Sequence, residues 1–170
     1  PRKHAYFECQ GVPKKGFTQH AEQGSAILFR NRMRRFFNSD RAVWLCYLLV
    51  ALAVSIQSLW QGTNIHGYTA FENYVIFKNS FWHLLNGQNP YAAYPLEQWD
   101  LYKYSPAFSL AMAPFAYLPN WLGLPLWNLL NAVPLLWAIH RLPILNPKQR
   151  RFLAWFILPE LVVSLQNSQS

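Results

Sequence analysis

The chain has 170 residues, of which 52% are apolar, 17% aromatic and 13% charged, and its formal net charge is +8. The aromatic content excludes a disordered protein, and two cysteines are too few for a disulfide-stapled secreted domain. Residues 42–71 and 104–140 contain no Asp, Glu, Lys or Arg, which excludes an ordinary soluble globule. The predicted fold class is an all-α integral membrane protein, a multi-span helical bundle.

Residues 1–32 mix Pro, Lys, Gly and Gln without helical or strand periodicity. Met33 is followed by two arginines, two phenylalanines and the first apolar run, a pattern typical of an initiator methionine ahead of a membrane segment. We therefore expect residues 1–32 to be a disordered segment or a mis-called extension, and residues 33–170 to form the membrane domain.

Residues 42–60 form the first predicted span, since 19 residues of helix cover about 28 Å, close to the thickness of a hydrocarbon core. Five arginines precede it or lie at its start: Arg30, Arg32, Arg34, Arg35 and Arg41. Basic residues favour the cytoplasmic side of a membrane, so the N-terminus is expected in the cytoplasm and residues 61–104 are expected to form an external loop. The expected location is a bacterial inner membrane. No nucleic-acid-binding motif accompanies the charge, so the predicted partners are membrane lipids, with no nucleic acid.

Residues 68–86 have the period of an amphipathic helix, which Gly87 is expected to end as a left-handed cap. We expect this helix to lie flat in the membrane interface between the first and second spans, with its polar arc facing water or headgroups. The arc consists of Glu72, Asn73, Asn79, Ser80, His83 and Asn86.

The later apolar runs predict further spans over about 105–118, 121–140 and 152–170, with a turn at Pro119-Asn120. This hairpin places the basic residues of 141–151 outside, against the positive-inside bias. A single kinked crossing over 104–140 is the alternative that satisfies the bias, but 37 residues are nearly twice the required length. Glu160 inside the last helix is expected to face protein or water.

The external loop holds the best candidates for catalytic residues, namely Glu72, His83, Glu97, Asp100 and Lys103. Carboxylates at a membrane surface can serve as general bases. The simpler alternative is that these are the polar residues that any exposed loop contains, with Asp100 and Lys103 forming an ion pair. Histidines do not recur at metal-ligand spacing and nucleotide-binding motifs are absent, so neither a metal nor a cofactor is predicted.

Several short motifs follow the first span: Leu84-Leu85-Asn86-Gly87-Gln88-Asn89-Pro90-Tyr91, Tyr104-Ser105-Pro106, Leu118-Pro119 and Leu126-Trp127-Asn128. Their order and spacing over residues 42–170 resemble the N-terminal part of glycosyltransferase family 87 (domain of unknown function 2029). These are polyprenol-phosphate mannosyltransferase-like proteins of the C-type membrane glycosyltransferase superfamily. The resemblance implies an inverting hexosyltransferase that moves a mannose-like sugar from a polyprenyl-phosphate donor to an extracytoplasmic glycan or lipid acceptor, without a cofactor.

The resemblance also implies a general base in the first external loop, at the position that Asn73 occupies here. An amide cannot take a proton, so Glu72 and Asp100 are the candidate catalytic residues. Substrate contacts are expected from Asn73, Asn79, His83, Lys103 and Tyr104. The family's chains are longer, so we expect an incomplete chain that is inactive alone. The alternatives are a transporter fragment, with Glu160 and His140 along a pathway, and a non-catalytic membrane scaffold.

Overall fold

The computed structural model describes residues 28–64 and 66–167, which belong to two units, residues 1–38 and 39–170. In the first unit, residues 28–37 are helical, so the expected boundary after residue 32 falls inside a helix. The rest of the expected extension, residues 1–27, lies outside the described residues. All elements discussed below belong to the second unit.

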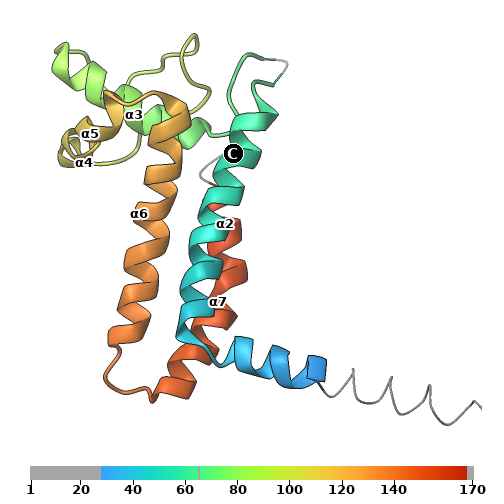
Figure 1. The fold of residues 1–170 in the computed structure, drawn as a ribbon. Coiled ribbons are helices and arrows are strands. Elements are labelled where there is room, and N and C mark those ends of the chain that lie inside the picture. The colour runs from blue at the N-terminus through green and yellow to red at the C-terminus, as the bar shows by residue number, and fades with distance from the viewer. Residues whose placement is uncertain (1–27, 65, 168–170) are drawn as a thin grey trace, which may run out of the picture. The chain divides into compact units, whose positions relative to one another are not determined.

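Three long helices form a bundle: α2 (Asp40–Gln61), α6 (Asn120–Arg141) and α7 (Pro147–Asn167). Helix α6 runs antiparallel to α2, and α7 turns back alongside both (Figure 1). Helices α2 and α6 have 22 residues each, or about 33 Å of helix. Within the described residues, these two helices are long and apolar enough to cross a membrane, as predicted for 42–60 and 121–140.

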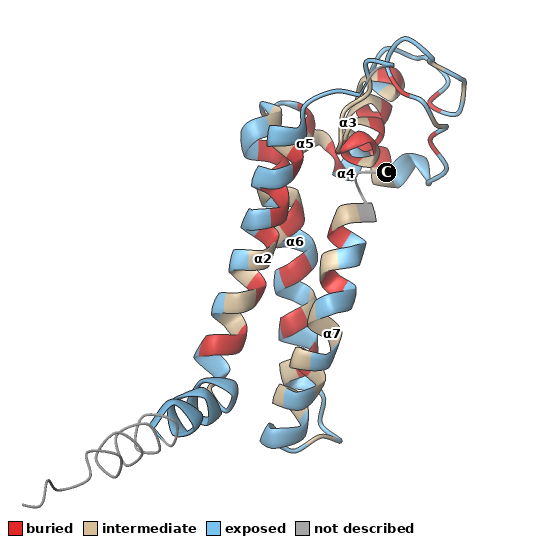
Figure 2. Cartoon of the chain, turned by 90° about the vertical axis from the view of Figure 1, so that its right-hand side faces the viewer, coloured by how far each residue is buried: buried red, intermediate tan, exposed pale blue. Residues whose placement is uncertain are grey.

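The bundle packs through small side chains on the facing sides of its helices, where Figure 2 shows the buried residues. Ala51 on α2, Ala132 on α6 and Ala154 on α7 are each fully buried, which lets the helix backbones approach closely. Two hydrogen bonds between buried residues connect the helices in the middle of the bundle. The Tyr47 hydroxyl donates to the carbonyl of Ala154 (2.8 Å), and the Asn128 amide donates to the Ser55 hydroxyl (2.8 Å).

The connection between α6 and α7 lies beside the first turn of α2. Arg151 Nη1 is 3.2 Å from Asp40 Oδ1, and the rings of Trp44 and His140 are 5.7 Å apart. Arg41 at the start of α2 and the basic residues of the α6–α7 connection therefore share one end of the bundle. This end is called the basic end below.

Residues 62–119 join the other ends of α2 and α6 and are called the cap. The cap contains α3 (Glu72–Leu85) and two short helices, α4 (Pro106–Ala111) and α5 (Ala113–Ala116), both packed on α3. Its core is rich in aromatic residues and consists of Phe71, Tyr74, Ile76, Phe77, Phe81, Tyr102, Met112 and Ala116, with Leu124 of α6. Helix α3 ends as predicted at Gly87 (φ +69°), where the amides of Gly87 and Gln88 bond back to Leu84 and His83.

The prediction of a spanning helix over 105–118 is wrong. Helices α4 and α5 have six and four residues, or about 9 and 6 Å of helix, so neither approaches the length of a span. Met112 packs into the cap core beneath α3 instead. The chain from 104 to 140 therefore contains one long helix, and the α6–α7 connection returns to the basic end. Helix α7 begins at Pro147, five residues earlier than expected, so its first turn includes Lys148. It is not among the described helices that are long and apolar enough to cross a membrane, so the span expected over 152–170 is not confirmed.

The prediction that the polar arc of α3 faces water is wrong for three of its members. Glu72, Ser80 and His83 are 2%, 1% and 4% exposed. Residues of the following loop cover Glu72 and His83, while α4 and α5 cover the apolar face. Helix α3 is thus the centre of the cap and does not lie flat on a surface with one side open.

Candidate functional site

Glu72 is a buried carboxylate at the start of α3. Its Oε2 accepts hydrogen bonds from the amide and the hydroxyl of Thr69, both at 3.1 Å, and its Oε1 accepts from the amide of Trp99 at 3.3 Å. No cation pairs with it among the described residues. These three bonds fix the carboxylate and tie the chain around residue 99 to the beginning of α3.

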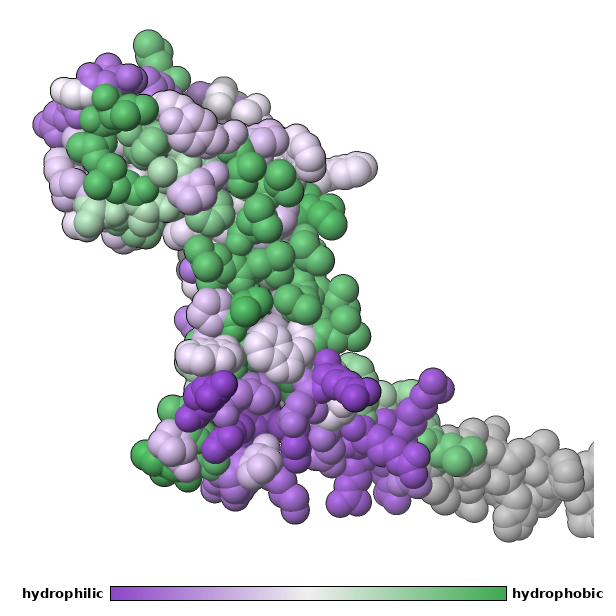
Figure 3. Space-filling model, turned by 60° about the vertical axis from the view of Figure 1, so that its left-hand side comes forward, coloured by the Kyte–Doolittle hydropathy of each residue, from purple (hydrophilic) through white to green (hydrophobic). Residues whose placement is uncertain are grey.

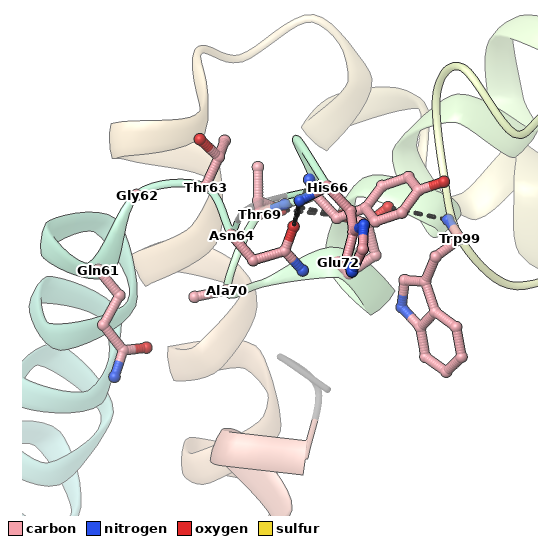
Figure 4. A pocket seen from close by; sticks show the side chains of 10 residues that line it. Gln61, Gly62, Thr63, Asn64, His66, Thr69, Ala70, Glu72 and Trp99 are labelled. Carbon is pink, nitrogen blue, oxygen red and sulfur yellow. Dashed lines mark hydrogen bonds between the residues drawn. The ribbon is translucent and has the colours of Figure 1, made fainter.

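A cavity of about 560 Å³ opens beside Glu72 and is called the first cavity (Figure 4). It lies at the cap end of α2 and is lined by Gln61, Gly62, Thr63, Asn64, His66, Tyr68, Thr69, Ala70, Glu72 and Trp99. Trp99 is 54% exposed, so a large aromatic face is available near the carboxylate. A proton acceptor, hydroxyls and an aromatic ring together suit the binding and deprotonation of a hydroxyl-bearing ligand.

Asn73 faces a different cavity, although it is the neighbour of Glu72. This second cavity has a volume of about 400 Å³ and is lined by Asn73, Phe77, Tyr104, Phe108, Trp127, Asn131, Ser164 and Leu165. The structure thus brings two predicted substrate-binding residues, Asn73 and Tyr104, together. It separates them from Glu72, because successive helical residues point about 100° apart.

The wall of the second cavity is built of aromatic rings around Phe77. The Phe77 ring meets those of Tyr104, Phe108 and Trp127 edge-on, with centroids 5.0, 5.1 and 5.9 Å apart. Within the described part of the chain, the hydroxyls of Tyr104 and Ser164 make no hydrogen bond. The cavity therefore offers amides, hydroxyls and ring faces, and no lining residue carries a charge.

Asp100, the other candidate base, forms an ion pair. Lys103 Nζ lies 2.6 Å from its Oδ2, and the amide of Leu101 donates to its Oδ1 at 2.7 Å. The hydrogen bond from Lys103 and the one from Leu101 lower the pKa of the Asp100 carboxyl. Asp100 is thus paired with a cation and lines neither of the two cavities, whereas Glu72 lines the first cavity, so the geometry favours Glu72 over Asp100.

His83 lies in a third place, under the loop that follows α3. Its Nε2 is 3.0 Å from Glu97 Oε2, and its ring stacks on that of Tyr94 at 3.7 Å. The remaining predicted contact residues, Asn79 and Lys103, line neither of the two cavities. The predicted site residues are therefore distributed over several parts of the cap.

Sequence reasoning missed several lining residues. Trp99, which lies between Gln98 and Asp100, is not among the predicted site residues. An aromatic residue in a polar loop is nevertheless a recognisable signal for ligand contact. Asn131 and Ser164 were also missed, although a polar residue within an apolar run is another such signal. Among the described residues, no cluster of His, Cys, Asp or Glu could hold a metal ion.

A transporter-like pathway through Glu160 and His140 gains no support from the geometry. His140 lies at the end of α6, where its Nδ1 is 2.9 Å from the carbonyl of Leu136. Glu160 is exposed in the second half of α7.

No protein-family model, curated protein or solved structure matches this chain.

Proposed function

We propose that the chain is the membrane-embedded part of an inverting glycosyltransferase, which moves a hexose from a polyprenyl-phosphate donor to an extracytoplasmic glycan or lipid acceptor. The observation that carries the proposal is the buried carboxylate of Glu72 at the wall of the first cavity, next to the exposed ring of Trp99. The resemblance of residues 42–170 to glycosyltransferase family 87 supports the same reaction.

The surface of the bundle supports placement in a membrane. Large apolar side chains are exposed on all three helices, namely Leu45, Leu49, Ile56, Leu126, Leu130, Trp137, Phe152 and Phe156. On the face drawn in Figure 3, hydrophobic surface covers the bundle between the cap and the basic end, and this surface is called the apolar belt below. An apolar surface of this extent on a monomer is typical of contact with lipid or another protein.

The two ends of the bundle support an orientation. The positive-inside bias assigns the basic end to the cytoplasm, and the cap then lies on the opposite side of the membrane. With one crossing between residues 104 and 140, the basic residues at 141–151 no longer conflict with the bias. The first cavity would then meet an extracytoplasmic acceptor.

In the proposed reaction, Glu72 takes the proton from an acceptor hydroxyl. The acceptor oxygen forms a bond to the anomeric carbon of the sugar while the bond from that carbon to the phosphate oxygen breaks, with inversion. Polyprenyl phosphate leaves with the electron pair, and the protonated Glu72 later returns its proton to water. Phosphate is a good leaving group, so one positioned base supplies the acid–base catalysis.

The test is a transfer assay with the full-length protein that contains these residues, reconstituted in liposomes and supplied with radiolabelled polyprenyl-phosphate hexoses and a lipid acceptor. Glu72→Gln is expected to lower kcat by about 10²-fold or more, because the base is lost. Donor binding by the same variant, measured by filter retention, is expected to stay within a few-fold and so reports intact folding. Asp100→Asn is the matched control and is expected to retain transfer.

Three outcomes decide between the assignments. Loss of transfer in Asp100→Asn but not in Glu72→Gln would move the base to Asp100. Full activity in both variants would refute a carboxylate base in the cap. Absence of both transfer and donor binding in the unmodified full-length protein would overturn the proposed function.

A non-catalytic scaffold is the second candidate function, and the second cavity favours it. Asn73 stands where the family has its catalytic carboxylate, and no residue lining this cavity can act as a base at neutral pH. Amides, hydroxyls and aromatic faces suit binding of a sugar without reaction. Donor binding that needs Asn73 and Asn131, together with no transfer by the unmodified full-length protein, would support this candidate.

A further inference from the structure

The basic end of the bundle gathers positive charge from three helix ends. Within residues 39–167, the five cations Arg41, Arg141, Lys148, Arg150 and Arg151 lie there, and Asp40 is the acid among them. Arg41 is the second residue of α2, Arg141 is the last of α6, and the other three belong to the first two turns of α7. Figure 3 shows hydrophilic residues gathered below the apolar belt.

Two of these arginines hold the end of the bundle in shape. Arg150 donates from Nη1 to the carbonyl of His140 (2.7 Å) and from Nε to that of Leu145 (2.9 Å), which closes the α6–α7 connection. Arg151 pairs with Asp40 at 3.2 Å, which fixes the start of α2 against α7. The single carboxylate is therefore already used inside the protein.

Three cations remain exposed: Arg41, Arg141 and Lys148. Within the described chain, no carboxylate pairs with any of them. The Arg141 guanidinium lies over the Trp137 ring, 5.1 Å from its centroid, and Trp137 is 54% exposed. A tryptophan at the end of an apolar helix is typical of headgroup depth, so its arginine lies where lipid phosphates are found.

We propose that the basic end is a binding site for the phosphate headgroup of an anionic phospholipid, which Arg41, Arg141 and Lys148 contact around the rigid α6–α7 connection. The lipid's acyl chains would lie along the apolar belt next to Trp137, which a free phosphate ion could not use. This inference relies on the membrane placement proposed above, but it does not rely on sugar transfer.

The test counts bound lipids by native mass spectrometry of the detergent-solubilised chain, titrated with dioleoyl-phosphatidylglycerol or dioleoyl-phosphatidylcholine. Phosphatidylglycerol is expected to bind more tightly. Each of Arg41→Gln, Arg141→Gln and Lys148→Gln should weaken its binding by about fivefold, the effect of one basic residue at an anionic surface. Arg141→Lys keeps the charge and should bind within about twofold of the unmodified chain. Lys103→Gln removes an exposed cation from the cap and should leave the affinity for phosphatidylglycerol within about twofold of that of the unmodified chain.

Equal affinity for the two lipids would overturn the proposal. An equal loss of affinity in Lys103→Gln would also overturn the proposal, because the net charge of the protein, and not a local site, would then explain the binding of the lipid. If millimolar inorganic phosphate competes with phosphatidylglycerol, the site binds a free anion and the proposed lipid site is overturned. Circular dichroism of each variant reports folding. Because the three side chains are exposed, we expect each variant to fold like the unmodified chain. Failure of the transfer assay with retained lipid selectivity would leave this site standing and refute the proposed function alone.

Discussion

The hydroxyl of Tyr74 occupies the space that a side chain at residue 123 would need. A Cβ atom on Gly123 would clash with the Tyr74 hydroxyl oxygen and would lie 3.2 Å from Cζ of the same ring. Tyr74 is fully buried in the cap core, and Gly123 is in the first turn of α6. This close approach is a direct connection between the cap and the bundle.

Gly123→Ala is therefore expected to destabilise the protein by about 1–3 kcal/mol, the usual result of overpacking a buried contact. The measurement is thermal or denaturant unfolding in detergent. The double variant Gly123→Ala with Tyr74→Phe is the control, since it removes the clashing oxygen. It should recover a large part of the loss, as coupling between contacting residues requires. Simple addition of the two single effects would contradict the contact.

The titration of Tyr74 gives a prediction at high pH. Burial raises the pKa of Tyr74 to about 12, from an ordinary value of 10. Between these two values the unfolded chain loses this proton while the folded chain keeps it, so the free energy of unfolding falls as the pH rises. Tyr74→Phe should show a shallower fall than the unmodified protein between pH 10 and 12. Equal slopes in unfolding experiments across this range would contradict the burial of the hydroxyl.

The Asp100–Lys103 pair should contribute little to stability. Both groups are partly exposed, and exposed pairs are worth less than about 1 kcal/mol. Since the pKa of Asp100 is lowered, its contribution is present above the ordinary value of 3.8 and disappears as the pH falls through the lowered value. The difference in melting temperature between the unmodified protein and Asp100→Asn should be small at pH 7 and should shrink further as the pH falls below 3.8. A difference that grows on acidification would refute the pair.

The sequence was sufficient to predict the long apolar helices and the end of α3, because these depend on local features. Length and hydropathy define α2 and α6, and a glycine followed by a proline defines the stop at Gly87. Hydropathy could not distinguish α4 and α5 from a span. What separates them is the packing of Met112 and Ala116 under α3, and a composition average does not contain that contact.

The candidate site was predictable in its residue types but not in its grouping. Helical periodicity placed Glu72, Asn73 and His83 on one arc correctly, but it could not reveal that the following loop would fold back over this arc. The bond from Trp99 to Glu72 joins residues 27 positions apart, and the bond from His83 to Glu97 joins residues 14 apart. Such pairs depend on the path of an irregular loop, so periodicity gave a single water-facing surface where the structure has separate cavities.

The most direct test of the account is the position of the cap and the basic end relative to the membrane. Cys9 and Cys46 are replaced by alanine, and either Gln88→Cys in the cap or Lys148→Cys at the basic end is introduced into the chain expressed in bacterial cells. With a membrane-impermeant maleimide, we expect the cysteine at position 88 to react in intact cells and the one at position 148 to react only after lysis. Protection of position 88 in intact cells would contradict an extracytoplasmic site. Reaction of both positions in intact cells would place them on the same side of the membrane and would contradict a single crossing by α6.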